Sequence, residues 1–305
     1  MTTASPPTSA GSEWLSVAEK GSVVGIRLTV WLATAAGRLP ARWLMRVVAL
    51  WYTLLHPGVR HASRDLGERL GQQRRGLHAI YRHVLCFAEA ALDRLWLVQG
   101  RGDLFELTRD GHDHLERLHA SGRGAILLSA HVGSTAAMAI GGHDERLRIR
   151  IVGYFKNAKM INAALYRLNP HAAAQVVHIE PGRADTVLDL KDRIDRGELL
   201  AIAADRVGLN DRTVQVEFLG QPAPFPAGPF LLAAMLQCPV YFVCGIYRAP
   251  NRYELHCEPF ADRVELPRKD REAALHRAVG QYADRVAHYV RAAPDNWFNF
   301  YKFWT

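Results

Sequence analysis

Hydrophobic residues change their spacing along the chain, from a helical period near the start to short continuous runs in the middle. Between Leu66 and Leu97 the apolar residues recur at helical spacing. The stretch from Leu104 to Leu118 predicts a short strand followed by a helix. Ala125–Ala130 is a short apolar run behind a glycine-rich turn, which is typical of a buried strand. The pattern therefore predicts N-terminal helices followed by a body that contains a sheet.

Further apolar runs alternate with helical patterns in the second half of the chain. The runs are Ile149–Phe155, Gln175–Ile179 and Leu199–Ala204, and the helical patterns are Lys159–Leu168 and Ala184–Arg196. Such alternation predicts parallel βαβ units. Three later runs are expected to extend the sheet: Thr213–Phe218, Val240–Tyr247 and Tyr253–Glu258. A long amphipathic helix is expected from Arg268 to Arg291, so the predicted fold class is α/β, a mostly parallel central sheet flanked by helices.

The pattern divides the chain into three parts. Residues 1–13 are rich in Ser, Thr and Pro without the apolar segment of a secretory signal, and they are expected to be a disordered lead-in. Residues 14–100 are expected to be helical, and residues 101–305 to form one continuous α/β body. Arginines interrupt the N-terminal apolar stretch before about 18 apolar residues accumulate, so a membrane-spanning helix is not expected there.

One N-terminal segment has an aromatic face. Trp43, Val47, Trp51 and Leu54 recur at helical spacing, with Arg42 and Arg46 beside them. This pattern is typical of an amphipathic helix that lies on an anionic membrane surface. It also fits a pair of helices that face a protein core, and the sequence leaves both interpretations open.

The composition excludes some classes of function but does not identify one. With 49% hydrophobic and 22% charged residues the chain can bury a core, and a net charge of +8 favours anionic partners. No motif for nucleic-acid binding accompanies the dispersed arginines, so no nucleic-acid partner is expected. The four cysteines lack CxxC spacing, which indicates neither a zinc site nor a disulfide framework.

Polar residues follow the predicted parallel strands directly. His131 ends the first strand, Lys156 follows a later one, and Asp205 with Arg206 follows another. Ligands of open α/β sheets bind where the carboxyl ends of parallel strands meet, so these side chains are expected to share one rim. An imidazole oriented by a carboxylate can remove a proton from a hydroxyl or amine. A structural role for this histidine is the alternative.

Several blocks of the sequence resemble a known superfamily. The stretch LLSAHVGSTA is similar to the first block of the lysophospholipid-acyltransferase superfamily, in which an acid follows the histidine by five positions. AIAADRVGLNDRTVQVEFLGQPAPFPAGPFLLAAMLQCPV resembles the later blocks of the branch that contains lipid A late acyltransferases and predicted bacterial acyltransferases. WLSVAEKGS, FAEAALDRLWLVQG and APDNWFNFYKFW resemble a bacterial subfamily of which some members accompany aryl-polyene pigment genes.

The resemblance implies an enzyme that moves a fatty or aryl-polyene acyl group from an acyl-ACP or acyl-CoA thioester to a hydroxyl or amine. The acceptor would be a bacterial lipid or pigment. Neither a cofactor nor a metal is implied. The resemblance also implies a peripheral protein on the cytoplasmic side of the inner membrane.

The chain departs from the family motif at one position. Five residues after His131 stands Ala136, where the motif has an acid. By the strand argument, Asp205 could reach His131 across the rim, and an acid in this later block resembles the histidine's partner in some members. We therefore assign His131 and Asp205 as catalytic residues. The alternative is an inactive acyltransferase-like protein that binds acyl chains or a partner enzyme.

Five further residues are assigned to substrate binding: Ser134, Lys156, Arg206, Phe225 and Gly228. The Arg206 guanidinium could bind a phosphate of the donor or an anionic lipid, or form only a surface salt bridge. Phe225, with Phe218 and Phe230, is expected to wall an acyl tunnel or simply fill the core. Gly228 precedes Pro229 and a helix expected over Phe230–Leu236, whose first N–H groups could bind an anion or only shape the loop. A serine hydrolase is disfavoured because no Gly-x-Ser-x-Gly elbow is present.

Overall fold

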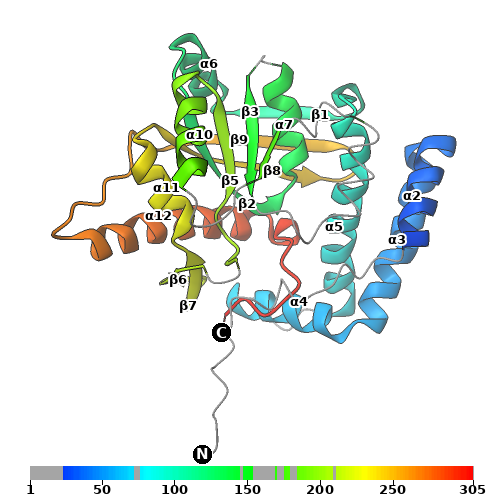
Figure 1. Ribbon diagram of the computed structural model, residues 1–305. Helices are drawn as coiled ribbons and strands as arrows, with labels where there is room; N and C mark the ends of the chain where they lie inside the picture. Colours follow the sequence, from blue (N-terminus) through cyan, green and yellow to red (C-terminus); the bar gives the residue numbers. More distant parts are fainter. Residues whose placement is uncertain are drawn as a thin grey trace, which may run out of the picture.

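The computed structural model describes residues 23–71, 76–144, 147–153, 169, 175–178, 184–208 and 211–304. In Figure 1 the N-terminal helices stand beside a sheet that has helices packed on it. The α/β class and the mostly parallel central sheet are as the sequence predicts. The lead-in expected at residues 1–13 and the helix expected over Lys159–Leu168 lie outside the described residues.

Four helices open the described chain: α2 (Val23–Ala36), α3 (Arg38–Leu55), α4 (Pro57–Arg69) and α5 (Leu77–Val98). The helical pattern predicted between Leu66 and Leu97 thus belongs to two helices. The inner face of α3 is buried, and its residues are Ala41, Arg42, Met45, Ala49 and Thr53. No helix within the described part of the chain is long and apolar enough to cross a membrane.

The outer surface of α2 and α3 exposes many large apolar side chains. These are Leu28, Trp31, Leu39, Trp43, Val47, Leu50, Trp51, Leu54 and Leu55. On α3 they recur every three or four residues, which is the spacing of one helix face. The side chains of Trp43 and Trp51 are among them, at 65% and 48% exposure. The Arg46 guanidinium lies 4.2 Å from the Trp43 ring centroid.

The expectation that Arg42 lies beside this outer face is wrong. Arg42 is on the buried side of α3, where its guanidinium donates to the Glu89 carboxylate at 2.6 Å and to the Tyr247 hydroxyl at 3.0 Å. Arg38 on the same helix makes two hydrogen bonds of 2.8 Å to Asp93 of α5. A buried charge is stable only when it is paired, so these arginines fix α3 to the body of the protein.

The central sheet has seven strands in the order β1-β9-β8-β2-β5-β3-β4. Their bounds are β1 Glu106–Asp110, β2 Ala125–Gly133, β3 Ile149–Gly153, β4 Val176–His178, β5 Leu199–Ala203, β8 Val240–Arg248 and β9 Arg252–Ala261. β8 and β9 pair antiparallel, and the other neighbours in this sheet pair parallel. The strand β2, which carries His131, therefore lies between two parallel neighbours.

Helices cover both faces of the sheet. They include α6 (His112–Ala120), α7 (Thr135–Asp144), α10 (Ala184–Asp195), α11 (Gly228–Leu236) and α12 (Arg271–Ala292). Alternate residues of β2 point to opposite faces, as in any strand. Ile126 and Leu128 belong to the main core, with residues of α10, α11 and α12. Ala125 and Leu127 pack on the other face with Leu115 of α6.

One strand prediction was wrong. Thr213–Phe218 forms β6, but β6 pairs antiparallel with β7 (Gln221–Pro226) in a separate two-stranded sheet. The alternation of β6 gave no clue to its partner, because a short hairpin and an added sheet strand share the same pattern. The helix expected over Phe230–Leu236 begins two residues earlier, at Gly228.

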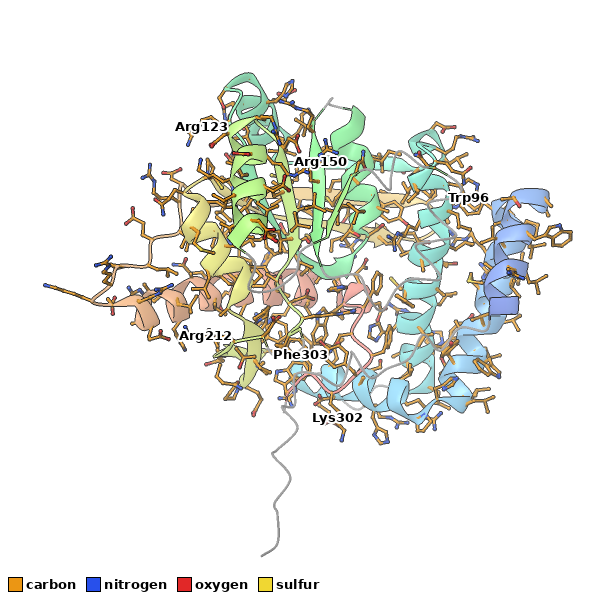
Figure 2. All side chains as sticks on the ribbon, viewed as in Figure 1. Trp96, Arg123, Arg150, Arg212, Lys302 and Phe303 are labelled. Atoms are coloured by element: carbon orange, nitrogen blue, oxygen red, sulfur yellow. The ribbon has the colours of Figure 1, made fainter. Side chains whose placement is uncertain are left out.

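The carboxyl ends of the parallel strands and the C-terminal tail share one edge of the molecule. Arg123 and Arg150 lie at or just before the start of β2 and β3, and Figure 2 shows both at the top of the view. Lys302 and Phe303 of the tail lie at the bottom, beside α4. The residues that follow the strands therefore meet the tail at this lower edge.

Candidate active site

His131 reaches this edge through an irregularity in β2. Gly133 has a φ of +69°, and a Cβ added there would lie 2.0 Å from the Gly245 carbonyl oxygen. Only glycine accepts both the left-handed backbone and this close approach. The next residue, Ser134, donates its N–H to the same Gly245 oxygen at 2.7 Å. This turn ends β2 at Gly133, two residues after the histidine.

Asp205 comes from the neighbouring parallel strand. The Ala204 N–H, just beyond β5, donates to the Ser129 carbonyl at 3.0 Å, so the two chains stay paired to this point. The following residue, Asp205, then lies opposite the end of β2. Its side chain is 2% exposed. The rim predicted from the strand pattern does bring these two residues together.

The Asp205 carboxylate holds His131 at two points. Its Oδ2 accepts the backbone N–H of His131 at 2.8 Å, and its Oδ1 lies 2.8 Å from the imidazole Nδ1. Burial alone would raise the pKa of Asp205, but the charge and hydrogen bonds of His131 and the charge of Arg206 outweigh it and lower the pKa below its ordinary value. An ionised carboxylate only accepts, so Nδ1 donates.

The His131 side chain keeps 35% of its surface exposed, whereas its carboxylate partner is almost fully covered. With Nδ1 donating to Asp205, a neutral imidazole carries its lone pair on Nε2. The fully buried Tyr282 donates its hydroxyl at 2.7 Å to the carbonyl of Ser129, two residues before His131 in β2. Burial, followed by the Asp205 charge, raises the pKa of Tyr282 well above its ordinary value, so this hydroxyl stays a proton donor.

The C-terminal tail completes the surroundings of His131, and sequence reasoning missed this role. The Phe298 N–H donates to the His131 carbonyl at 2.9 Å, and Trp297 forms an isolated bridge with Val132. His83 of α5, which is fully buried, bonds the Trp297 carbonyl through Nε2 at 2.8 Å. The aromatic residues between Trp297 and Trp304 favour packing on the body or contact with lipid, and the structure shows Trp297 and Phe303 in the main core. Composition alone does not predict the pairing with β2.

Ser134 and Ala136 lie at the start of α7. The Ser134 hydroxyl accepts the Ala137 N–H at 3.2 Å, which is the arrangement of a helix N-cap. Ala136 is partly buried and packs with an apolar cluster that includes Phe105 and Ile140. Ser134 thus has a structural bond in this structure, and its contact with substrate stays a prediction.

The remaining predicted residues lie at different places. Arg206 donates to the Phe298 carbonyl at 2.8 Å, and Lys156 lies outside the described residues. Phe225 is fully buried in the main core, where it packs against other aromatic rings, so the structure shows it as a core residue. Gly228 is exposed at the first residue of α11. Substrate contacts of Lys156, Phe225 and Gly228 therefore stay predictions.

Neither a metal-binding cluster nor a reactive thiol is found beside His131 among the residues that the structure describes. No group of three or more His, Cys, Asp or Glu side chains that could hold a metal ion occurs among the residues for which the structure gives positions. Cys86, Cys238, Cys244 and Cys257 are free thiols. Burial raises the pKa of Cys238 to about 11, so its reactive thiolate form is suppressed at neutral pH.

Comparison with known proteins identifies the family of the chain. Residues 98–305 match the family described as bacterial lipid A biosynthesis acyltransferase. The match contains both His131 and Asp205 and covers more than half of the chain. No curated protein matches the sequence closely enough to count as a relative. A histidine and a carboxylate joined at the strand ends, within a match of this length, show that the chain belongs to the bacterial lipid A biosynthesis acyltransferase family and is an acyltransferase.

Proposed function

We propose that the protein transfers an acyl group from a thioester to a hydroxyl or amine of a lipid or pigment, with His131 as the general base. The observation that carries the proposal is the two-point hold of Asp205 on His131. A carboxylate on Nδ1 fixes the tautomer and supports the positive charge that forms when Nε2 takes a proton. Family membership supports acyl transfer in bacterial lipid biosynthesis in general.

The proposed reaction is one direct transfer. Nε2 of His131 removes the proton from the acceptor O–H or N–H as that atom attacks the thioester carbonyl. The carbonyl carbon forms its new bond to the acceptor, and the C–S bond breaks. The thiolate leaves with the electron pair and takes the proton from the imidazolium. The protein thus returns to its starting state, and Asp205 stays ionised throughout.

Ala136 is the observation that favours the alternative, an inactive acyltransferase-like protein that binds acyl chains or a partner enzyme. The motif acid is missing there, and a methyl group cannot orient an imidazole. Against this, Nδ1 of His131 already has a carboxylate partner in Asp205 at 2.8 Å. We favour the active enzyme because the function of the missing acid is provided from a neighbouring strand.

The proposed donor is acyl-ACP or acyl-CoA, and the proposed acceptor is a lipid or an aryl-polyene pigment. The net charge of +8 supports an acidic carrier protein and an anionic membrane as partners. We place the protein on the cytoplasmic side of the bacterial inner membrane, as a peripheral protein.

The outer surface of α2 and α3 supports membrane contact. Exposed apolar patches of this kind mark sites of interaction with membranes or proteins. Trp43 and Trp51 suit an interface, because their rings are large, apolar and carry a polar N–H. Arg46 and Arg27 are exposed on the same helices and could contact anionic headgroups. The ion pairs of Arg38 and Arg42 with two acidic residues of α5 would connect the membrane-bound helix α3 to the rest of the protein.

The test is mass spectrometry of products formed from a labelled donor. Acyl-CoA or acyl-ACP with an isotope-labelled acyl chain is incubated with a bacterial lipid and pigment extract and the purified full-length protein. We expect label in one product class with the native protein and in none with His131→Ala. The matched control is His119→Ala, because this exposed histidine lies on α6. Equal transfer by the His131→Ala protein would overturn the proposed mechanism.

A further inference from the structure

Strand β2 separates from β8 at the catalytic histidine. Ser129 lies opposite Val243, and Gly133 lies opposite Gly245. Four steps along β2 thus correspond to two steps along β8, so β2 has two extra residues in this interval. A bulge of this kind removes the ladder partners of the bulged residues. The β5 ladder also ends at Ser129, opposite Ala203, so His131 has a register partner in neither neighbouring strand and its backbone groups must be bonded from elsewhere.

Asp205 and the C-terminal tail provide those bonds. The His131 N–H donates to the Asp205 carboxylate, and the His131 carbonyl accepts the Phe298 N–H. Next to them, Val132 pairs with Trp297. We call Asn296–Phe298 the C-terminal strap. It bonds β2 beyond the end of β5, on the edge opposite β8, which stays paired with β2 at Gly133 and Ser134.

The strap is fixed at its other residues. The Asn296 side chain accepts the Tyr247 N–H at 2.7 Å and donates to the Tyr247 carbonyl at 3.1 Å. The Trp297 carbonyl bonds His83, and the Trp297 ring is 1% exposed. Both residues are therefore anchored to β8 and α5. Phe298, the residue that contacts His131, lies at the end of the anchored part.

Arg206 closes a ring of contacts around the proposed base. Its Nη2 donates to the Phe298 carbonyl at 2.8 Å, while the Phe298 N–H donates to His131. Arg206 follows Asp205 directly in the chain, and Asp205 holds the other side of His131. The same guanidinium lies 5.9 Å from the Tyr301 ring centroid, within the tail. The Arg206 guanidinium therefore points toward the strap and the tail that follows it.

We propose that Arg206 is a positioning residue for the reaction, which fixes Phe298, and through it the His131 backbone, and keeps a positive charge beside Asp205. This inference rests on the proposed function. It replaces the sequence-based interpretation in which Arg206 binds a phosphate of the acyl donor. The two assignments differ in a measurable way, because only a phosphate-binding residue distinguishes donors with phosphates from donors without them.

The kinetic test compares two donors and two variants. Acyl-CoA carries phosphates, whereas the acyl thioester of N-acetylcysteamine has none. We expect Arg206→Met to lower kcat about 10- to 100-fold with both donors, the range for losing a hydrogen bond from a charged group, with KM changed less than about threefold. Arg206→Lys keeps a charged donor and should recover much of kcat. A rise in KM for acyl-CoA alone, at unchanged kcat, would overturn the proposal.

A second measurement needs no substrate. Amide hydrogen exchange over residues 293–304 should become about tenfold faster or more in Arg206→Met, because the strap loses the bond at Phe298. The matched control is Arg212→Met, labelled in Figure 2, which breaks an ion pair with Glu272 at the surface. Unchanged exchange in Arg206→Met would refute the positioning role. Absence of turnover by the native protein would instead count against the proposed function, and exchange would still decide the role of Arg206 in the strap.

Discussion

Replacing Asp205 by asparagine tests the proposed catalytic pair of His131 and Asp205 with the smallest change in shape. The native carboxylate accepts two hydrogen bonds of 2.8 Å, one from the His131 backbone N–H and one from Nδ1. An asparagine side chain has one oxygen that accepts and one NH₂ that only donates. If the oxygen keeps the backbone N–H, the NH₂ group faces Nδ1. The imidazole must then accept on Nδ1 and carry its proton on Nε2. Nε2, the atom proposed to remove the acceptor's proton, then has no free lone pair.

The expected magnitude follows from this reversal. General-base catalysis contributes roughly 10²- to 10⁴-fold to the rate. Loss of the base in its reactive tautomer should therefore lower kcat by about 10²- to 10⁴-fold, or about 2.7 to 5.4 kcal/mol at about 1.36 kcal/mol per tenfold. KM should change little, because Asp205 is 2% exposed and has almost no surface for a substrate.

The assay measures initial rates of Asp205→Asn and the native protein with one donor and one acceptor across pH. Asp284→Asn is the control, because Asp284 is exposed on α12. A kcat within about threefold of the native value at every pH tested would refute the catalytic assignment of Asp205.

Stability gives an independent measure of the same residue. The pKa of Asp205 is lowered in the folded protein, so its ionised form stabilises the fold at pH values above the ordinary pKa of an aspartate. This stabilisation is lost as the pH falls through the lowered pKa. Asp205→Asn should therefore be less stable than the native protein near neutral pH, and the difference should shrink in acid. Thermal unfolding of both proteins at several pH values measures the trend.

Two further predictions concern the missing motif acid and the membrane surface. Ala136→Glu should raise the rate little, because Asp205 already occupies Nδ1 of His131, and a rise of about 100-fold or more in the same assay would favour a disabled motif instead. The double variant Trp43→Ser and Trp51→Ser should bind anionic liposomes more weakly by about tenfold or more in a flotation assay. Moving one large apolar side chain from water into the membrane contributes about 1.5–3 kcal/mol to binding. Binding should also fall with added salt, and equal flotation of variant and native protein would reject this surface.

The sequence predicted the sheet where burial imposes a simple pattern. A strand covered on both faces needs an uninterrupted apolar run, so Ala125–Ala130 and Leu199–Ala204 could be recognised directly. The polar residues after these runs could then be assigned to one rim. Thr213–Phe218 shows the limit of this reasoning. Its alternation predicts a strand, but the partner of a strand depends on how the whole chain is arranged.

Local sequence also gave the position of His131 and its departure from the family motif at Ala136. The strand argument paired His131 with Asp205, 74 residues later, and the structure added the geometry of their hydrogen bonds. It also moved Arg42 from the expected interface to a buried ion pair. A helical pattern shows which residues share a face of the helix. It does not show which of the residues beside the apolar face, such as Arg42, turn toward the rest of the protein.

Tertiary structure alone decided the surroundings of the His131–Asp205 pair. The bulge in β2, the strap at Phe298 and the bond from Arg206 join segments that no spacing rule relates. Sequence determines which residues can be buried and which polar groups end a strand, because these depend on near neighbours. The backbone N–H and C=O groups of a bulged strand need hydrogen-bond partners from elsewhere in the chain. Only the packing of the folded molecule determines which distant groups provide them.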